Sequence, residues 1–428
     1  MNLLFKFLVI VSILVNCSGS KVLELSDKFP TIRKQGNTQW LVMFYAPWCG
    51  HCKRLEPVWA QVSQALYRTN LRVGRIDCTR FTSIASEFSI SGFPTIKFIT
   101  SDNDFTYHGD RNKEDIINFA LRMAGPPVQQ VTRPESLANL KGMNQLFFMY
   151  VGDQEGPLWD SFNNVATKMQ PHSFFYVTTK EIAGSHVNIS RDLPAVFVHK
   201  DNLHYFYSID MNSSDPDHLN NTMYNWINEE RFATFPKITR GNINEILQTK
   251  KYIVLAVVEE DKAHEVPQDM LRFRNMVESV ISKNREKYHR YFQFGWVGNP
   301  ELANSIAMKV LPLPYLLVLN STTNHHHIPE EEDALQMTTE YLEDFLERIH
   351  NQSAPVYGGN SLIVRLYRTY FEARTSLSDM WRGNPVLTTV LFGLPLGFLS
   401  LILYSICCAD ILDADEDEEE ELLHEKKE

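Results

Sequence analysis

The chain has 428 residues and a formal net charge of −11, a length sufficient for several domains. Its last nineteen residues hold eleven carboxylates and two lysines, so the rest of the chain is close to neutral. A near-neutral body offers no basic surface for a nucleic-acid backbone and no charged groove for acidic substrates. We therefore expect no nucleic-acid partner.

The N-terminus begins with an apolar run from Leu3 to Val15, interrupted only by Lys6 and Ser12. Small residues follow at 18–20. This pattern predicts a secretory signal peptide over residues 1–20, whose removal also removes Cys17.

Residues 21–125 alternate apolar strands with helices, which predicts an α/β sheet with helices on both faces. Gly125-Pro126-Pro127 ends the alternation and marks a domain boundary. The predicted strands are Val22–Leu25, Trp40–Tyr45, Leu71–Asp77, Thr95–Ile99 and Phe105–His108, and the predicted helices are Asp27–Gln35, Lys53–Tyr67, Thr82–Phe88 and Lys113–Met123.

The motif Trp48-Cys49-Gly50-His51-Cys52 stands between a strand-like run and a helix-like segment. Two intervening residues on the first helical turn bring the sulfurs of Cys49 and Cys52 close enough to form a disulfide. Cys49 faces the unpaired N–H groups and the positive end of the helix dipole, which favour its thiolate. His51 adds a second cation when it is protonated. A stabilised thiolate is a good leaving group, so the motif predicts a dithiol that transfers its disulfide to a substrate.

The alternative for this motif is one half of a zinc site. The sequence contains no second CxxC or CxxH element, however, and a structural zinc site needs four ligands. We therefore favour redox chemistry without a metal or other cofactor.

The stretch Tyr45–Lys53 resembles the active site of the protein disulfide isomerases, and Gly92–Phe98 resembles the cis-proline loop of thioredoxin folds. The resemblance implies a cis bond between Phe93 and Pro94, which presents backbone beside Cys49 for pairing with an extended substrate. Trp48 joins Phe93 and Pro94 as an expected substrate contact. The alternative is an ordinary trans proline that opens a strand.

By the same resemblance, Cys49 is both the attacking and the leaving sulfur in exchange with the substrate. Cys52 resolves the mixed disulfide by attacking Cys49. His51 stabilises the reduced form. Arg111 matches an arginine that lowers the pKa of the second cysteine, although a surface arginine at the start of a helix is the alternative. Met43 is a departure, since most family members have a buried Glu or Asp there that takes the proton of the second cysteine. We therefore expect slower resolution in this chain.

Two further units of similar length repeat the pattern, each with a proline before an apolar strand, at Pro194 and Pro314. Neither contains a cysteine, and both resemble the redox-silent thioredoxin-like domains of disulfide isomerases. The predicted strands of these units are Leu146–Val151, Phe174–Val177, Leu193–Val198, Tyr252–Val258, Phe292–Val297 and Leu313–Val318, and their predicted helices are Trp159–Met169, Leu219–Phe232, Gln268–Lys287 and Thr339–Ile349.

Several other residues have more than one interpretation. Cys78 is expected to be an inert buried thiol, with a redox partner of the dithiol as the alternative. His325-His326-His327 is expected in a solvated polar loop rather than at a metal. Five N-x-S/T sequons mark candidate glycosylation sites at Asn188, Asn212, Asn220, Asn320 and Asn351.

The C-terminal part begins with an expected stalk over residues 353–384, whose end is expected to form an interfacial helix. Residues 385–408 form an expected transmembrane helix, because the run from Val386 to Cys408 is uncharged and long enough to span a bilayer. The buried helix of a soluble protein is the alternative. Residues 409–428 are expected to be a disordered acidic tail. Cys407 and Cys408 are either palmitoylated or plain membrane-boundary residues.

The order of these segments resembles the transmembrane thioredoxin-related disulfide isomerases. The expected fold is α/β: three tandem thioredoxin-like domains (21–125 redox-active, 126–235 and 236–352 redox-silent), followed by one transmembrane helix. The signal peptide sets a single-pass type I topology, because the acidic tail lacks the usual positive charges on the cytosolic side. Lys426 and Lys427 resemble an endoplasmic-reticulum retrieval signal, displaced by one residue from its usual position.

The expected activity is that of a protein disulfide isomerase in the lumen of the endoplasmic reticulum, acting on cysteines of folding proteins. Glutathione or an oxidase is the expected redox partner. One alternative is a client-holding chaperone with secondary redox activity. Another is a reductase or redox sensor, although a histidine-containing CGHC favours oxidising potentials.

Overall fold

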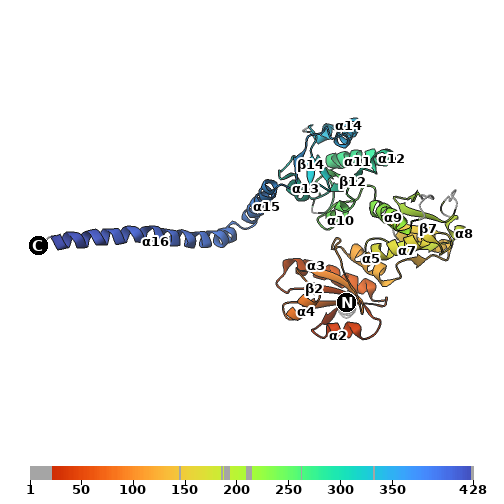
Figure 1. Ribbon diagram of the computed structural model, residues 1–428, viewed down its shortest axis with the longest axis horizontal. Coiled ribbons are helices and arrows are strands. Elements are labelled where there is room, and N and C mark those ends of the chain that lie inside the picture. Colours follow the sequence, from red (N-terminus) through yellow and green to blue (C-terminus); the bar gives the residue numbers. More distant parts are fainter. Residues whose placement is uncertain are drawn as a thin grey trace, which may run out of the picture.

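The computed structural model describes residues 22–143, 146–184, 187, 193–208, 215–261, 263–330 and 333–425, with side chains to residue 406. Figure 1 shows three α/β units in succession, followed by helices that extend away from them. Each unit contains one five-stranded sheet.

The first unit has strand order β1-β3-β2-β4-β5, in which β2 is parallel to β3 and antiparallel to β4. Its strands are β1 (Leu23–Leu25), β2 (Gln39–Tyr45), β3 (Leu71–Asp77), β4 (Thr95–Ile99) and β5 (Asp104–Thr106). Its helices are α2 (Phe29–Lys34), α3 (Gly50–Leu66), α4 (Thr82–Glu87) and α5 (Lys113–Ala124).

The central strand β2 is buried on both faces, which explains its continuous apolar sequence. Leu41 and Met43 pack on one face with residues of α3 and α5. Val42 and Phe44 pack on the other face with residues of α2 and α4. This double packing fixes the end of β2, from which the chain enters the dithiol motif.

The second unit has strand order β10-β9-β7-β8-β6. Its strands are β6 (Gln129–Gln130), β7 (Leu146–Val151), β8 (Phe175–Thr178), β9 (Ala195–Lys200) and β10 (Leu203–Phe206). Its helices are α6 (Pro134–Met143), α7 (Pro157–Met169), α8 (Lys180–Gly184) and α9 (Pro216–Glu230).

The third unit has strand order β12-β11-β13-β14-β15. Its strands are β11 (Tyr252–Val257), β12 (Phe292–Val297), β13 (Tyr315–Asn320), β14 (His325–His327) and β15 (Tyr357–Gly358). Its helices are α10 (Ile243–Leu247), α11 (Gln268–Lys283), α12 (Arg285–Tyr288), α13 (Pro300–Ala307), η1 (Ala334–Gln336) and α14 (Thr339–His350).

Two expectations for the third unit differ from the structure. The histidine run is not a solvated loop: it forms β14, where His326 and His327 are buried and His327 Nδ1 lies 2.8 Å from the Pro355 carbonyl oxygen. The segment expected to begin the stalk supplies β15, which pairs with β14. One pairing explains both differences. Because β15 covers the outer edge of β14, the histidine run is an inner strand of the sheet rather than a solvated loop.

Polar contacts join the first and second units. The Arg122 guanidinium donates to the Pro171 carbonyl at 2.8 Å, and the Gln170 amide donates to the carbonyls of Arg122 and Gly125. These bonds fix the connection around residues 122–125.

The second and third units share a buried ionic cluster around Glu230, which is 6% exposed. Lys200 Nζ lies 2.7 Å from Glu230 Oε2, and Arg285 and His289 contact the same carboxylate. Because each charge has a partner inside the interface, the cluster fixes the two units relative to each other.

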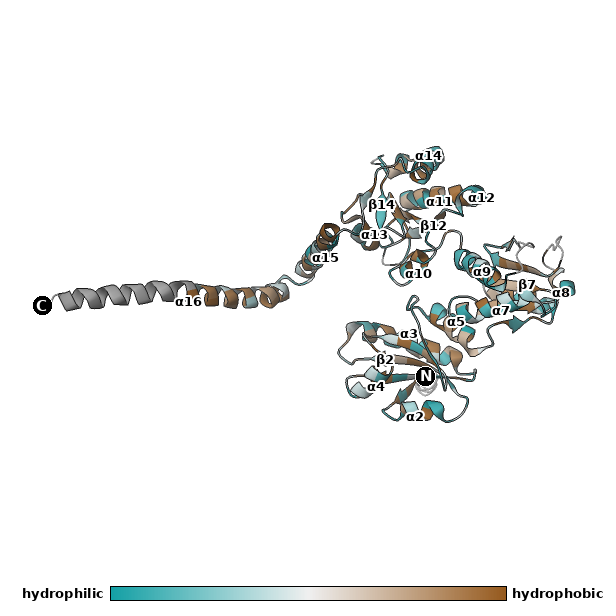
Figure 2. Cartoon of the chain, in the orientation of Figure 1, coloured by the Kyte–Doolittle hydropathy of each residue, from teal (hydrophilic) through white to brown (hydrophobic). Residues whose placement is uncertain are grey.

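Two helices follow the third unit: α15 (Leu362–Gly383) and α16 (Pro385–Glu425). Figure 2 shows that hydrophobic residues predominate along the first part of α16. Among the described residues, Pro385–Ile406 is the one candidate membrane span by length and composition. The acidic segment was expected to be disordered, but α16 continues through it to Glu425, because the segment lacks Gly and Pro and is rich in good helix formers.

Candidate active site

Cys49 is the N-cap residue of α3, and Cys52 lies in its first turn. Cys49 is 8% exposed and Cys52 is 2% exposed, and both are free thiols. Together with Ala46 they form a small cluster against which Tyr45 and Phe93 pack. The outer sulfur therefore borders the surface, while the inner one is covered.

The two thiols have opposite pKa shifts. The pKa of Cys49 is lowered, chiefly because the Cys52 side chain and backbone N–H hydrogen-bond to its sulfur. Burial raises the pKa of Cys52 to about 11. At neutral pH the outer thiol is therefore the nucleophile, and the inner one stays protonated until a base accepts its proton.

The loop before β4 lies beside Cys49. The Phe93–Pro94 peptide bond is cis, and Cys49 Sγ lies 3.7 Å from the Phe93 carbonyl oxygen. Leu193–Pro194 and Leu313–Pro314 are cis as well, at the corresponding places in the other two sheets. The structure thus brings the proline loop to the dithiol, as its spacing predicts.

Trp48 is 73% exposed next to this loop, and its ring contacts Phe93 edge-on with centroids 6.3 Å apart. An exposed indole beside a nucleophilic sulfur provides apolar contact area for an unfolded chain. Trp48 and Phe93 therefore form one apolar surface at the mouth of the site.

The His51 imidazole contacts the side chain of Arg54. Arg54 Nη2 lies 2.8 Å from His51 Nδ1, and an arginine only donates, so this nitrogen accepts. The contribution of His51 to the lowered pKa of Cys49 is a hydrogen bond from its backbone N–H. This bond adds to the larger contribution of the Cys52 side chain and backbone.

Arg111 is exposed, but its side chain is directed toward the site. Its Nη2 donates to the Pro94 carbonyl at 3.1 Å, and its charge lowers the pKa of both cysteines as a secondary contribution. The position links the start of α5 to the proline loop. Arg111 is thus a surface arginine at the start of a helix, as one interpretation expects, and its charge also acts on the thiols, as the other expects.

Met43 is fully buried and lies opposite Arg75 in the pairing of β2 with β3. The Arg75 guanidinium contacts Glu24 and also Glu56, the latter at 2.9 Å, and lies over the Tyr45 ring at 5.1 Å. The carboxylates near this strand position therefore come from β1 and α3, not from β2 itself. No motif in the sequence indicated this group of Arg75, Glu24 and Glu56.

A cleft of about 910 Å³ begins at the proline loop and runs between the first and third units. Pro94, His108 and Arg111 line one wall, and Arg240 and Glu245 line the opposite wall. No local sequence signal indicates this cleft, because its walls come from separate domains.

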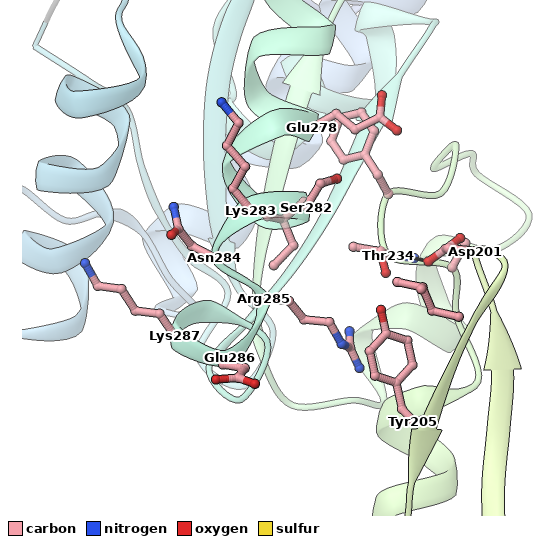
Figure 3. Close-up of a pocket in the computed structure, with 14 residues that line it drawn as sticks. Asp201, Tyr205, Thr234, Glu278, Ser282, Lys283, Asn284, Arg285, Glu286 and Lys287 are labelled. Carbon is pink, nitrogen blue, oxygen red and sulfur yellow. Dashed lines mark hydrogen bonds between the residues drawn. The ribbon is translucent and has the colours of Figure 1, made fainter. Parts of the chain in front are cut away.

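A second hollow, of about 690 Å³, lies between the second and third units (Figure 3). Figure 3 shows Arg285 beside Tyr205, and the guanidinium carbon lies 3.8 Å from the ring centroid. Its lining residues include no cysteine.

The remaining candidate residues lie apart from the dithiol. Cys78 is buried as expected, and burial raises its pKa to about 11. Asn320 and Asn351 lie at the ends of β13 and α14, whereas Asn220 lies half-buried within α9. Asn188 and Asn212 fall outside the described residues. Within the described part of the chain, no group of three or more His, Cys, Asp or Glu residues is suited to a metal ion.

Family models confirm the thioredoxin fold. The model described as Thioredoxin matches residues 21–122, and the one described as Thioredoxin-like domain matches residues 151–348. A crystal structure of human ERp44 aligns with 78% of this chain and 87% of its own, at 14% identity and a TM-score of 0.34.

Full-length relatives extend the match beyond the folded domains. The protein disulfide-isomerase TMX3 of Xenopus laevis is 34% identical over 95% of this chain and 86% of its own length. The human protein of the same name is 31% identical over 98% of this chain and 91% of its own length. With the apolar helix α16, these matches indicate a membrane-anchored protein. The chain belongs to the TMX3 group of the protein disulfide-isomerase family.

Proposed function

We propose that this chain is a single-pass type I membrane protein of the endoplasmic reticulum. Its dithiol Cys49/Cys52 oxidises and isomerises cysteines of folding proteins in the lumen. The proposed division is a signal peptide (1–20), a catalytic domain (21–125), two redox-silent domains (126–235 and 236–352), a connecting segment (353–384), a span (385–408) and a cytosolic tail (409–428).

The observation that carries this proposal is the asymmetry of the two thiols. Cys49 has a lowered pKa and is the more exposed of the two thiols, at 8% against 2%, whereas burial keeps Cys52 protonated. A dithiol with one reactive and one covered sulfur can form a mixed disulfide with a client and then resolve it.

In the oxidising direction, a client thiolate attacks the Cys49 sulfur of the closed disulfide, and the electron pair of the broken bond passes to Cys52. A second client thiolate then attacks the client sulfur of the mixed disulfide and releases the Cys49 thiolate. The client gains one disulfide, and the enzyme is left with two reduced cysteines. Glutathione disulfide or an oxidase restores the closed form.

In isomerisation the reduced enzyme acts first: the Cys49 thiolate attacks a client disulfide and releases one client thiolate. Cys52 resolves the mixed disulfide if the client does not rearrange. The Phe93 carbonyl, 3.7 Å from Cys49 Sγ, and the exposed Trp48 ring support binding of the client backbone at this point.

Cys52→Ser tests the assignment, because the variant retains the attacking sulfur and lacks the resolving one. We expect it to accumulate mixed disulfides with scrambled ribonuclease, whose disulfides the Cys49 thiolate attacks, visible on non-reducing gels. Cys49→Ser is expected to form none and to lose isomerase activity. Equal trapping by both variants would contradict the roles proposed here.

The cleft beside Pro94 favours client holding as a second function, because a volume of about 910 Å³ next to the dithiol accommodates an unfolded segment. The double variant Cys49→Ser/Cys52→Ser separates the two functions. If holding dominates, this variant still suppresses aggregation of a denatured client; if thiol exchange dominates, suppression is lost with the sulfurs.

Topology and glycosylation are tested together. Asn320 ends β13 and Asn351 follows α14, where it is exposed, so we propose that they receive glycans if residues 21–384 are lumenal. We expect glycosidase treatment to increase the electrophoretic mobility of the protein, and Asn351→Gln to remove part of that change. A chain without any glycan would contradict the lumenal placement.

A further inference from the structure

Helix α15 carries an apolar surface that no other part of the described chain covers. It has 22 residues, and none of them is buried. Eight of its large apolar side chains expose between 38% and 77% of their surface. These side chains are Leu362, Ile363, Leu366, Tyr367, Tyr370, Leu377, Met380 and Trp381.

The exposed apolar residues share one face of the helix. At 3.6 residues per turn, Leu366, Tyr370, Leu377 and Trp381 follow each other along a single stripe. The opposite face is the one that contacts the third domain: Ser305 of α13 donates to Glu372 at 2.7 Å. Phe371, Thr375 and Asp379 border a hollow shared with α13. The helix therefore turns its more polar face toward the protein and its apolar face outward.

This arrangement is the reverse of that of a surface helix on a soluble domain, whose apolar face packs on the core. The eight exposed apolar side chains of α15 lie together, unlike the singly scattered apolar residues of an ordinary surface. An apolar face that points away from the protein therefore requires a different apolar environment.

The continuation of the chain identifies that environment. Asn384 alone separates the end of α15 from Pro385, where the membrane-spanning part of α16 begins. The last turn of α15 is consequently at the bilayer surface. Figure 1 shows α15 bent away from the line of α16, so the two helices do not form one continuous rod.

We propose that α15 lies along the bilayer surface, on the side of the membrane where the three domains fold, with its apolar face inserted between the lipid headgroups. Three of its exposed side chains are Tyr or Trp, which favour the membrane–water interface. The helix has four arginines against two carboxylates, which suits the phosphates of the headgroups. Arg374, near the apolar stripe, can extend its charged end to the headgroup level.

The contact of α15 with α13 gives the proposal a structural consequence. A helix that is fixed in the interface on one face and bonded to the third domain on the other holds that domain close to the membrane. The buried cluster around Glu230 then holds the second domain relative to the third. Clients are thus received by domains at a set distance from the lipid surface.

The test uses the full chain in nanodiscs whose phosphatidylcholine is brominated on the upper part of the acyl chains. Bromine quenches the fluorescence of nearby indoles. The emission of Trp381 is obtained by subtracting the emission of the Trp381→Phe variant from that of the parent chain. We expect Trp381 to lose at least about half of its emission, as an indole seated in the interface does. The matched control, Trp381→Phe/Asp379→Trp, moves the indole to the face toward α13 and is expected to lose much less.

A second variant distinguishes a helix that lies flat from one that stands away from the membrane. Trp381→Phe/Tyr370→Trp places the indole on the same face, eleven residues or about 16 Å further from the span. A flat helix gives quenching at both positions. Quenching at position 381 alone overturns the proposal, as does equal quenching of the Asp379→Trp control or no quenching at all. The last result would instead favour a second copy of the chain or a client as the occupant.

Discussion

The Thr239 hydroxyl donates a hydrogen bond to Asp110 Oδ1 at 2.6 Å, and this bond joins the third domain to the loop that carries Arg111. The Thr239 oxygen also accepts from the N–H groups of Gly241 and Asn242, so its own hydrogen is directed to Asp110. Gly241 leaves room for this contact, because a Cβ at that position would lie 2.3 Å from Asp110 Oδ1. The neighbouring Arg111 donates to the Pro94 carbonyl. A residue of a redox-silent domain thus positions a charge beside the dithiol.

Thr239→Val should raise the pKa of Cys49. The substitution keeps the shape of the side chain but removes the donor, which frees the loop and weakens the influence of Arg111 on the thiolate. We expect alkylation of Cys49 below its pKa to slow about twofold, equivalent to about 0.4 kcal/mol. Stopped-flow alkylation across pH measures this change.

The control for this prediction is Thr239→Ser, which retains the hydroxyl and should behave like the parent. If the effect acts through Arg111, Thr239→Val should change nothing further in an Arg111→Met background. An equal slowing in that background would show that Thr239 acts by another route.

Cys49 should be alkylated long before the other two cysteines of the first domain. Its pKa is lowered by hydrogen bonds from Cys52, whereas burial raises the pKa values of Cys52 and Cys78 to about 11. A thiol with that pKa is about one part in ten thousand thiolate at pH 7. Mass spectrometry of the reduced protein after timed iodoacetamide treatment should show labelling of Cys49 at least about a hundredfold faster. Comparable labelling of Cys52 would contradict the asymmetry.

Met43→Glu should accelerate the resolution of mixed disulfides at neutral pH. Met43 is fully buried on the face of β2 under α3, and a thioether cannot accept the proton that Cys52 must lose. A carboxylate at this position supplies a base, with an expected gain on the order of 100-fold. Met43→Gln is the matched control of similar shape without a base. An unchanged rate for Met43→Glu in a quenched-flow assay at pH 7 would refute the role of this position.

Glu230→Gln should destabilise the pair of redox-silent domains. The substitution leaves Lys200, which is 1% exposed, and Arg285 without their carboxylate. Loss of one partner in a buried ion pair costs about 3–5 kcal/mol. Glu301→Gln removes the exposed pair with Arg240 and should cost less than about 1 kcal/mol. Urea unfolding of both variants measures the difference, and equal midpoints would contradict it.

The protein should lose stability as the pH falls from about 6.5 toward 4. Burial lowers the pKa of His326 and of His204 to about 4, so the unfolded chain binds protons in this range before the folded one does. Each such histidine removes up to about 1.4 kcal/mol per pH unit. Replacing His326 with Gln should reduce the slope of the melting temperature against pH, whereas the exposed His218→Gln should not. A slope unchanged by His326→Gln would exclude this histidine as a cause.

The sequence predicted the strands of all three sheets best where apolar runs are buried on both faces, as in β2, β7 and β11. Such a run has the same signature in any tertiary context. Several short strands lack it, so β6, β10, β14 and β15 were not expected. A predicted helix over Gln268–Lys287 is divided in the structure at Asn284, between α11 and α12. The small helices α6, α8 and α13 were also not predicted, because short segments carry weak periodicity.

The dithiol and the order of domains follow from the amino-acid sequence itself, because the geometry of two cysteines three residues apart on a helix is local. The tertiary structure alone decided which groups act on those sulfurs. Thr239 and Asp110 are 129 positions apart, and Arg111 reaches Pro94 across 17. The bond from Thr239 to Asp110 depends on how separately folded units pack, and the bond from Arg111 to Pro94 depends on how distant segments of one unit meet. No local residue pattern contains either. The same holds for the exposed apolar face of α15. The sequence contains its helical periodicity, but only the position of α13 shows which face of the helix is covered.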